Sequence, residues 1–130
     1  MTPAEAYFVH DLVMHEYGGR PGIRDIGAIE SALARPYCGY FPRIEKKAAA
    51  LVHSLTLNHG FVDGNKRTAV FMLAILLRES GYALEFENMD VLNEEIVAMI
   101  LAVAEHRMTF NEIAAWVKKR LVKLPSDNPN

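Results

Sequence analysis

The chain has 130 residues, enough for one domain with its own hydrophobic core. Hydrophobic residues make up 51% and charged residues 23%, and the formal net charge is −2, so no overall positive field favours nucleic acid or an anionic membrane. Cys38 is the only cysteine, which excludes an intrachain disulfide framework and fits a reducing cytosol. We expect no secretory signal, and no unbroken apolar run, including 69–77, is long enough to span a bilayer. We expect a cytoplasmic protein that has no membrane or direct nucleic-acid partner.

The first helix begins at a clear start signal. Thr2-Pro3-Ala4-Glu5 is a capping box with proline at the first helical position, and Gly18-Gly19 ends the helix. We expect its apolar face to lie in the core, and this face comprises Phe8, Val9, Leu12 and Val13.

Two more helices precede the middle of the chain. After a loop rich in glycine and proline, Asp25 caps a short second helix through residue 33, which Pro36 stops. Residues 36–42 contain two prolines, a glycine and three aromatic residues, and predict a loop or a short β-hairpin flap. A third helix is expected over 44–58, with apolar residues spaced on one face.

The second half predicts three further helices. The fourth spans about 65–80 and is apolar on every side, which is typical of a central helix surrounded by others. Apolar and polar residues alternate weakly over 82–86, which predicts a short extended segment. A fifth helix is expected over 90–106, and a second capping box at 109–112 starts a sixth. We expect one domain over 1–124 and a disordered tail over 125–130.

The connection between the third and fourth helices carries the polar chemistry. Its letters are HGFVDGNKR, residues 59–67. His59 ends one helix, and its imidazole can take a proton from a hydroxyl near neutral pH. Asp63 supplies the hard oxygen ligand that Mg²⁺ prefers, since this metal uses one or two protein carboxylates and completes its shell with phosphates and water. Phe61 alternates with these polar residues and is expected to anchor the loop in the core.

The start of the fourth helix predicts an anion site. Amide groups at a helix N-terminus lack partners and carry a partial positive charge. Gly64 lets phosphates approach the backbone, and the amide of Asn65 follows it. Lys66 and Arg67 add full charges, which oppose the helix dipole unless an anion binds. We therefore predict that Gly64, Asn65, Lys66 and Arg67 bind phosphate.

Other polar residues are interpreted as structural or solvated. This applies to the remaining histidines, His10, His15, His53 and His106. The aromatic residues of the 36–42 loop either cover the core or form a flap that docks a target, so the target-docking segment stays unassigned.

The motif resembles the signature of the Fic/Doc (Fido) family, H-x-F-x-[DE]-G-N-[GK]-R, at every fixed position. Lys66 stands where Fic enzymes carry glycine, and the segments 17–25, 30–36 and 47–55 are similar to the Doc (death-on-curing) toxin branch. The resemblance implies an all-α Fido fold, a compact bundle of about six helices. It also implies that ATP and Mg²⁺ are used to transfer the γ-phosphate to a threonine, expected on elongation factor Tu, which arrests translation. A Phd-type antitoxin is the implied partner.

Three alternatives stay open. A Fic-type enzyme would use the same residues, with the phosphates in another pose, to transfer AMP to a protein hydroxyl. A non-catalytic module would only bind a partner. A metal hydrolase would use His53, His59 and Asp63, although their spacing is not typical of a metal site.

Overall fold

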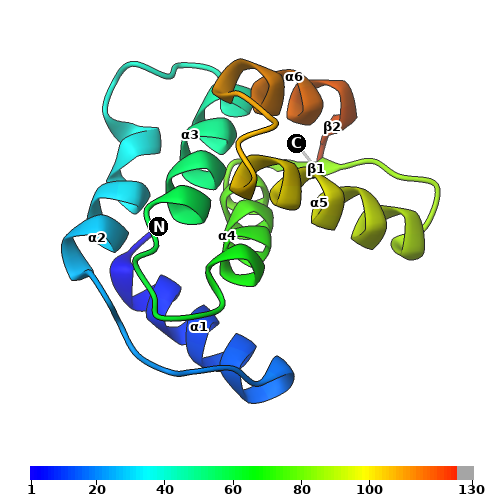
Figure 1. Ribbon diagram of the computed structural model, residues 1–130. Helices are drawn as coiled ribbons and strands as arrows, with labels where there is room; N and C mark the ends of the chain where they lie inside the picture. Colours follow the sequence, from blue (N-terminus) through cyan, green and yellow to red (C-terminus); the bar gives the residue numbers. More distant parts are fainter. Residues whose placement is uncertain (126–130) are drawn as a thin grey trace.

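Helices account for most of residues 1–125, which are the residues that the computed structural model describes (Figure 1). Within them, six α-helices confirm the all-α fold class: α1 (Pro3–Tyr17), α2 (Ile26–Ala34), α3 (Ile44–Leu57), α4 (Asn65–Glu79), α5 (Met89–Ala104) and α6 (Phe110–Arg120). A 3-10 helix, η1 (Arg35–Tyr37), continues α2. The tail predicted over 125–130 lies, apart from Pro125, outside the described residues.

Helix α3 occupies the centre of the bundle. It packs against α2, α4, α5 and α6, and its alanines Ala48, Ala49 and Ala50 are fully buried. Small side chains let neighbouring helices approach on several sides, so α3 has few exposed positions. The prediction that α4 is surrounded on every side was wrong, because one face of α4 leaves Phe71 exposed.

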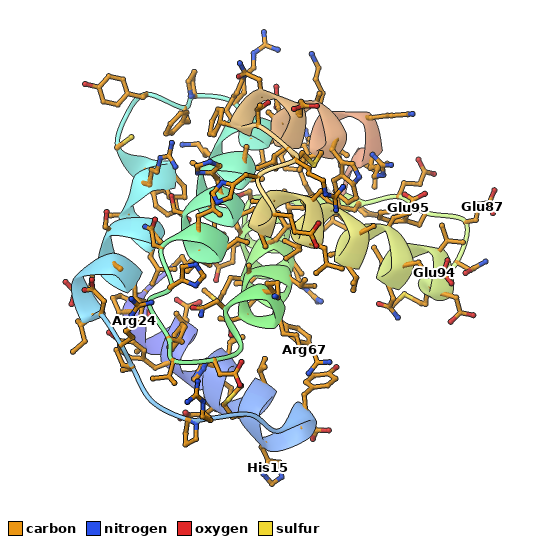
Figure 2. The ribbon with its side chains drawn as sticks, viewed as in Figure 1. His15, Arg24, Arg67, Glu87, Glu94 and Glu95 are labelled. Carbon is orange, nitrogen blue, oxygen red and sulfur yellow. The ribbon has the colours of Figure 1, made fainter. Side chains whose placement is uncertain are left out.

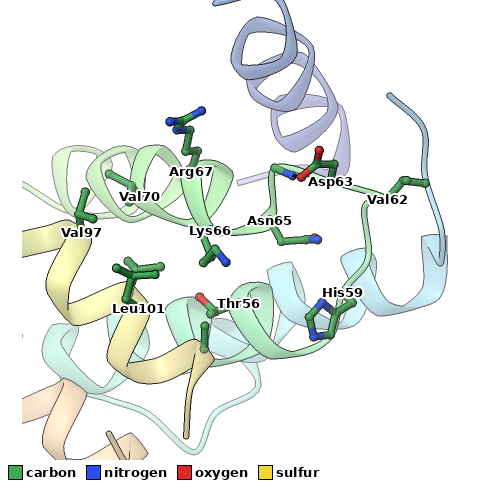
Figure 3. Close-up of a pocket in the computed structure, with 13 residues that line it drawn as sticks. Thr56, His59, Val62, Asp63, Asn65, Lys66, Arg67, Val70, Val97 and Leu101 are labelled. Atoms are coloured by element: carbon green, nitrogen blue, oxygen red, sulfur yellow. Dashed lines mark hydrogen bonds between the residues drawn. The ribbon is translucent and has the colours of Figure 1, made fainter. Parts of the chain in front are cut away.

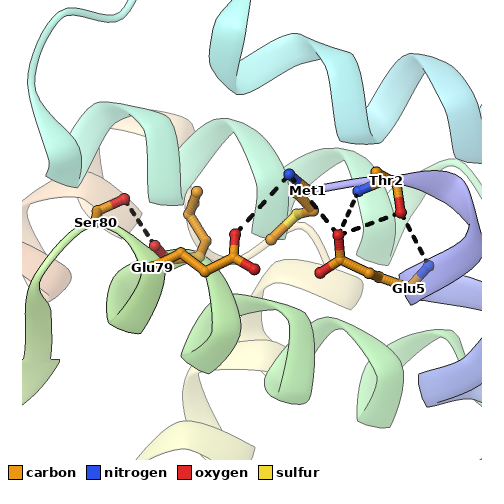
Figure 4. A network of polar contacts seen from close by, with 6 residues as sticks. Met1, Thr2, Glu5, Glu79 and Ser80 are labelled. Carbon is orange, nitrogen blue, oxygen red and sulfur yellow. Dashed lines mark hydrogen bonds and ion pairs between the residues drawn. The ribbon is translucent and has the colours of Figure 1, made fainter.

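The predicted helix starts are confirmed by their hydrogen bonds. Thr2 and Glu5 form the capping box of α1, with the Glu5 amide donating to the Thr2 hydroxyl and the Thr2 amide to Glu5 Oε1 (Figure 4). The Met1 amino group lies 4.0 Å from the Glu5 carboxylate and 3.9 Å from that of Glu79, which joins the start of α1 to the end of α4. Asp25 accepts the amide of Ala28 and caps α2.

The predicted inward face of α1 was partly wrong. Val9 and Val13 are buried as expected, but Phe8 is 64% exposed and Leu12 is 49% exposed. The buried stripe consists of positions 6, 9, 10 and 13, which follow the i, i+3, i+4, i+7 spacing of one helix face. Phe8 and Leu12 lie beside this stripe, on a side that no other described helix covers.

The short strands lie outside the loop that was a candidate for a flap. Residues 36–42 form the 3-10 turn and bends, and contain no strand. Instead β1 (Tyr82–Leu84), inside the predicted extended piece, pairs antiparallel with β2 (Leu121–Lys123). This pair follows the ends of α4 and α6 directly and lies beside α6 in the view of Figure 1. Among residues 1–125, no helix is both long and apolar enough to cross a membrane.

Candidate functional site

The motif turn, residues 58–64, connects the end of α3 to the start of α4. His59 is exposed and has a left-handed backbone, with φ of 50°, which is uncommon for a residue other than glycine. Gly60 next to it is buried against Ile29, where a β-carbon would collide with that side chain. The turn therefore passes close to α2 while it presents the His59 imidazole outward.

Phe61 holds the middle of the turn in the core. Its side chain is 2% exposed, and its ring stacks on His10 with centroids 3.9 Å apart and meets the Tyr7 ring edge-on. Its backbone also forms an isolated antiparallel bridge with Ile23 of the loop after α1. These contacts leave the turn little freedom to move away from α1.

The Asn65 side chain closes the turn on itself. Its Oδ1 accepts the Phe61 amide at 3.0 Å, and its Nδ2 donates to the Phe61 carbonyl at 2.9 Å. Each end of the side-chain amide makes one bond within the turn, so the second N–H of Nδ2 and the backbone amide of Asn65 are left for a ligand.

Asp63 is exposed, and both of its carboxylate oxygens accept backbone amides. Oδ2 accepts the Arg20 amide at 3.1 Å, and Oδ1 accepts the Gly64 amide at 2.8 Å. These bonds, the Arg20 one first, lower the pKa of the carboxyl, and the charges of Arg20 and His10 add to the effect. The carboxylate is ionised at neutral pH, and each oxygen keeps a further lone pair for a metal ion.

The first turn of α4 is an uncapped helix N-terminus. Gly64 precedes it with φ of 78°, and within residues 1–125 no side chain caps the helix. The amides of Asn65, Lys66 and Arg67 are therefore free to bind an anion. Both Lys66 and Arg67 line the pocket, but their side chains diverge, with Lys66 pointing toward Thr56 and Arg67 leaving another side of α4 (Figures 2 and 3). The Arg67 Cζ lies 4.1 Å from the centroid of the Tyr17 ring.

A pocket of about 460 Å³ adjoins these groups. Its polar end is formed by the motif turn and the start of α4, including His59, Asp63 and Lys66. Its other end is apolar and comes from α4 and α5: Val70, Val97, Ile100, Leu101 and Ala104. Such a pocket suits a ligand that has an anionic end and an apolar or aromatic end.

Sequence reasoning missed three contributors to the site. His10 contacts the turn, Thr56 lies in the pocket, and α5 supplies the apolar wall. His10 lies on the buried stripe of α1 and faces the protein interior, whereas the inward face predicted from the sequence did not include it. Thr56 is buried, and its hydroxyl has no hydrogen-bond partner among residues 1–125.

The histidines predicted for a hydrolytic metal site are not brought together. Residues 1–125 contain no group of three or more His, Cys, Asp or Glu side chains that could hold a metal ion. His53 Nδ1 instead lies 3.4 Å from the Arg35 guanidinium, and burial first, then the Arg35 charge, lowers the pKa of His53.

The helical bundle and the motif turn are features that the chain shares with one protein family. The model of the Fic/DOC family matches residues 1–77, more than half of the chain, and the chain belongs to this family. Its helical architecture is accordingly that of the Fido fold.

Two relatives narrow the comparison to one branch. Toxin Doc of Mycolicibacterium smegmatis is 48% identical over 58 residues, which cover 41% of this chain and 45% of that protein. Protein kinase doc of Escherichia phage P1 is 34% identical over 86 residues, which cover 62% of this chain and 68% of the phage protein. The match thus spans less than half of the first relative. Both relatives are Doc proteins, so the chain falls in the Doc branch of the family.

Proposed function

We propose that the chain is a Doc-like toxin that transfers the γ-phosphate of ATP to a protein threonine, with elongation factor Tu as the expected acceptor, and thereby arrests translation. One observation carries this proposal. A single pocket joins an exposed histidine, an ionised carboxylate and an uncapped helix N-terminus. The names of the relatives, a toxin and a protein kinase, support the same assignment.

The pocket residues fit ATP and Mg²⁺. The free amides of α4 and the Lys66 ammonium can hold phosphate oxygens, and the apolar wall from α5 can receive the base. Asp63 presents an ionised, exposed carboxylate beside these amides, which is the donor that Mg²⁺ takes from a protein when phosphates supply other ligands. Bound Mg²⁺ would neutralise charge on the phosphates during transfer.

The residues of the chain act mainly by positioning and proton transfer. His59 accepts the proton of the threonine hydroxyl, whose oxygen forms a bond to the γ-phosphorus. The bond between that phosphorus and the oxygen bridging to the β-phosphate breaks, and ADP leaves with the bonding electrons. The α4 amides and Lys66 stabilise the negative charge that collects on the leaving phosphates.

Lys66 favours phosphoryl over AMP transfer. Its side chain points into the pocket from the first turn of α4 (Figure 3). It adds bulk and charge where Fic enzymes have glycine, which favours a changed pose of the phosphates. Transfer of AMP by the same residues is the second candidate function, and a partner-binding module without catalysis is the third.

Variants of two exposed histidines test the proposal. With ATP and Mg²⁺, the wild-type chain should label elongation factor Tu, and His59→Ala should lose the label because the hydroxyl proton has no acceptor. His15→Ala is the matched control, since His15 is exposed on α1 outside the pocket (Figure 2). Full labelling by His59→Ala would overturn the role of His59. Partner binding by a wild type that labels no acceptor would favour the binding module.

An exposed apolar groove supports an antitoxin partner. It lies between α1 and α4, encloses about 710 Å³, and is lined by Phe8, Leu12, Tyr17, Phe71 and Ile75 among others. Contiguous apolar side chains of this kind mark interaction sites in soluble proteins. We propose that the apolar face of an antitoxin segment of the Phd type covers this groove.

A further inference from the structure

His10 makes the most direct contact between α1 and the motif turn. Its side chain is 3% exposed, and its Nε2 lies 2.8 Å from the backbone carbonyl oxygen of Asp63. A carbonyl oxygen only accepts hydrogen bonds, so Nε2 carries the hydrogen and donates it. The same ring stacks on Phe61 with an interplanar angle of 6°, which fixes its orientation.

Two further side chains extend this contact along α1. Met14 and Tyr17 follow His10 at i+4 and i+7 and therefore share its helix face. A β-carbon on Gly64 would lie only 2.5 Å from the methyl carbon of Met14. The Tyr17 ring lies under the Arg67 guanidinium. One face of α1 thus contacts the turn and the first turn of α4.

The hydrogen bond from His10 holds a peptide group that in turn binds the Asp63 carboxylate. The Asp63–Gly64 peptide accepts from His10 through its carbonyl and donates through its amide to Asp63 Oδ1. Both polar atoms of this peptide are engaged, so it cannot rotate without breaking one of these bonds. If the peptide rotates, the Asp63 carboxylate loses one of the two amides that hold it, and the N-cap residue of α4 changes conformation.

We infer that His10 is a positioning residue for the transfer reaction, which acts by holding the Asp63–Gly64 peptide and through it the Asp63 carboxylate and the free amides of α4. The inference rests on the proposed function. His10 does not touch the reacting atoms, because its ring is buried between α1 and the turn.

Two substitutions separate the hydrogen bond from the packing. His10→Phe keeps an aromatic ring against Phe61 but removes the donor, whereas His10→Gln retains a side-chain N–H but removes the ring. We expect His10→Phe to lower kcat about tenfold or more, because small displacements of positioned groups are costly in catalysis, with the KM for the protein acceptor unchanged. His10→Gln should recover most of the lost kcat.

Val13→Ala is the control for a loss of stability alone. Val13 is buried on the same helix but makes none of the described hydrogen bonds to the turn. The Val13→Ala substitution should lower the melting temperature and leave kcat at the wild-type value. The inference is overturned if kcat in the three variants follows the melting temperature, or if His10→Gln is as slow as His10→Phe.

Amide hydrogen exchange tests the inference without an activity. In His10→Phe the amides of Gly64 and Arg20, which donate to Asp63, should exchange about tenfold faster or more, as expected for local opening. The Val62 amide, which donates to the Gly22 carbonyl, should keep its rate. Unchanged exchange at Gly64 would overturn the inference. Faster exchange in a chain that labels no acceptor would instead show that the proposed function fails while the positioning contact stands.

Discussion

At the scale of single residues, the motif turn separates groups that hold its shape from groups that are left for a ligand. The Asn65 side chain bonds both polar atoms of Phe61, and the Phe61 ring is buried in the core. The His59 imidazole is exposed, and Lys66 points into the pocket. Asp63 belongs to both sets, because its oxygens accept two amides and still have lone pairs to offer. The shape of the site therefore depends on backbone contacts as much as on the residues that do the chemistry.

Gly64 is the residue whose substitution should disturb this arrangement most directly. Gly64→Ala forces a side chain into the left-handed region and against Met14, so we expect a loss of more than about 1–2 kcal/mol in the free energy of unfolding. Gly81→Ala is the control, since Gly81 also has positive φ but has open space around its α-carbon. Denaturant unfolding of the two variants should show the larger loss at Gly64. Equal losses would mean that Met14 does not restrict this position.

The lowered pKa of Asp63 predicts a pH-dependent stability. A carboxyl with a depressed pKa stabilises the fold above its unfolded pKa, and this contribution is lost as the pH falls through the folded pKa. Asp63→Asn should therefore melt below the wild type at pH 7, and the difference should shrink as the pH falls below about 4. Melting curves across this range test the expectation. A difference that does not change with pH would contradict it.

At the scale of elements, α1 contacts the motif turn with one face and leaves apolar side chains exposed on the adjacent side. One face carries His10, Met14 and Tyr17 against the motif turn and α4, and the adjacent side leaves Phe8 and Leu12 exposed. Helix α4 likewise contributes its first turn to the pocket and Phe71 to the groove. Helix α4 thus borders both the candidate catalytic site and the candidate partner surface, whereas α1 lines the partner surface and contacts the motif turn.

The capping box of α6 gives a test at this scale. Thr109 and Glu112 exchange hydrogen bonds at the start of the helix. The bond from the Thr109 backbone amide first, and then the Thr109 side chain, lower the pKa of the Glu112 carboxyl. Thr109→Ala should cost about 1 kcal/mol of stability, while Thr109→Ser should cost much less because it keeps the hydroxyl. Calorimetric melting of both variants measures the effect. Equal melting temperatures for the two variants would show that the hydroxyl is not the cause.

Local signals predicted the helices well, because capping residues and apolar spacing act within a few residues. Asp25 and both capping boxes mark observed helix starts. Contacts between distant segments were not predictable in this way. Phe8 and Leu12 are apolar like a core residue, but only the arrangement of the helices determines that nothing in residues 1–125 covers them.

The candidate site was predicted as a set of residues but not as a geometry. The motif letters indicated a base, a metal ligand and an anion site, and the structure places these residues around one pocket. The divergence of Lys66 and Arg67, the wall from α5 and the contact of His10 depend on packing across the chain. A lone histidine on an apolar helix face carries no sequence signal that distinguishes a packed residue from a positioning one.

At the scale of the whole molecule, the pocket and the groove lie on different sides of α4. The pocket uses α4 together with α5, and the groove uses α4 together with α1. They meet at Arg67, which lines the pocket and lies over the groove residue Tyr17. Substitutions away from this contact, such as those on α5 or at Phe8, therefore separate catalysis from partner binding and distinguish the proposed toxin from a module that only binds.

Phe8→Glu tests the groove. A charge in place of an exposed aromatic ring should weaken binding of the C-terminal segment of a Phd-type antitoxin about tenfold or more, because apolar surface is no longer buried on association. Labelling of the protein acceptor should stay at the wild-type level. Isothermal titration with the antitoxin peptide, compared with an Asp11→Ala control on an exposed part of α1, measures the effect. Unchanged affinity would place the antitoxin elsewhere.

The central claim, phosphoryl transfer at the motif turn, is tested most directly by ATP labelled separately at the α- and γ-phosphates. The chain is incubated with Mg²⁺, each labelled ATP and elongation factor Tu, and the label on the acceptor is then counted. We expect γ-label on the acceptor, no α-label, and loss of the γ-label in His59→Ala. Transfer of the α-label would contradict the account and would assign the chain to AMP transfer instead.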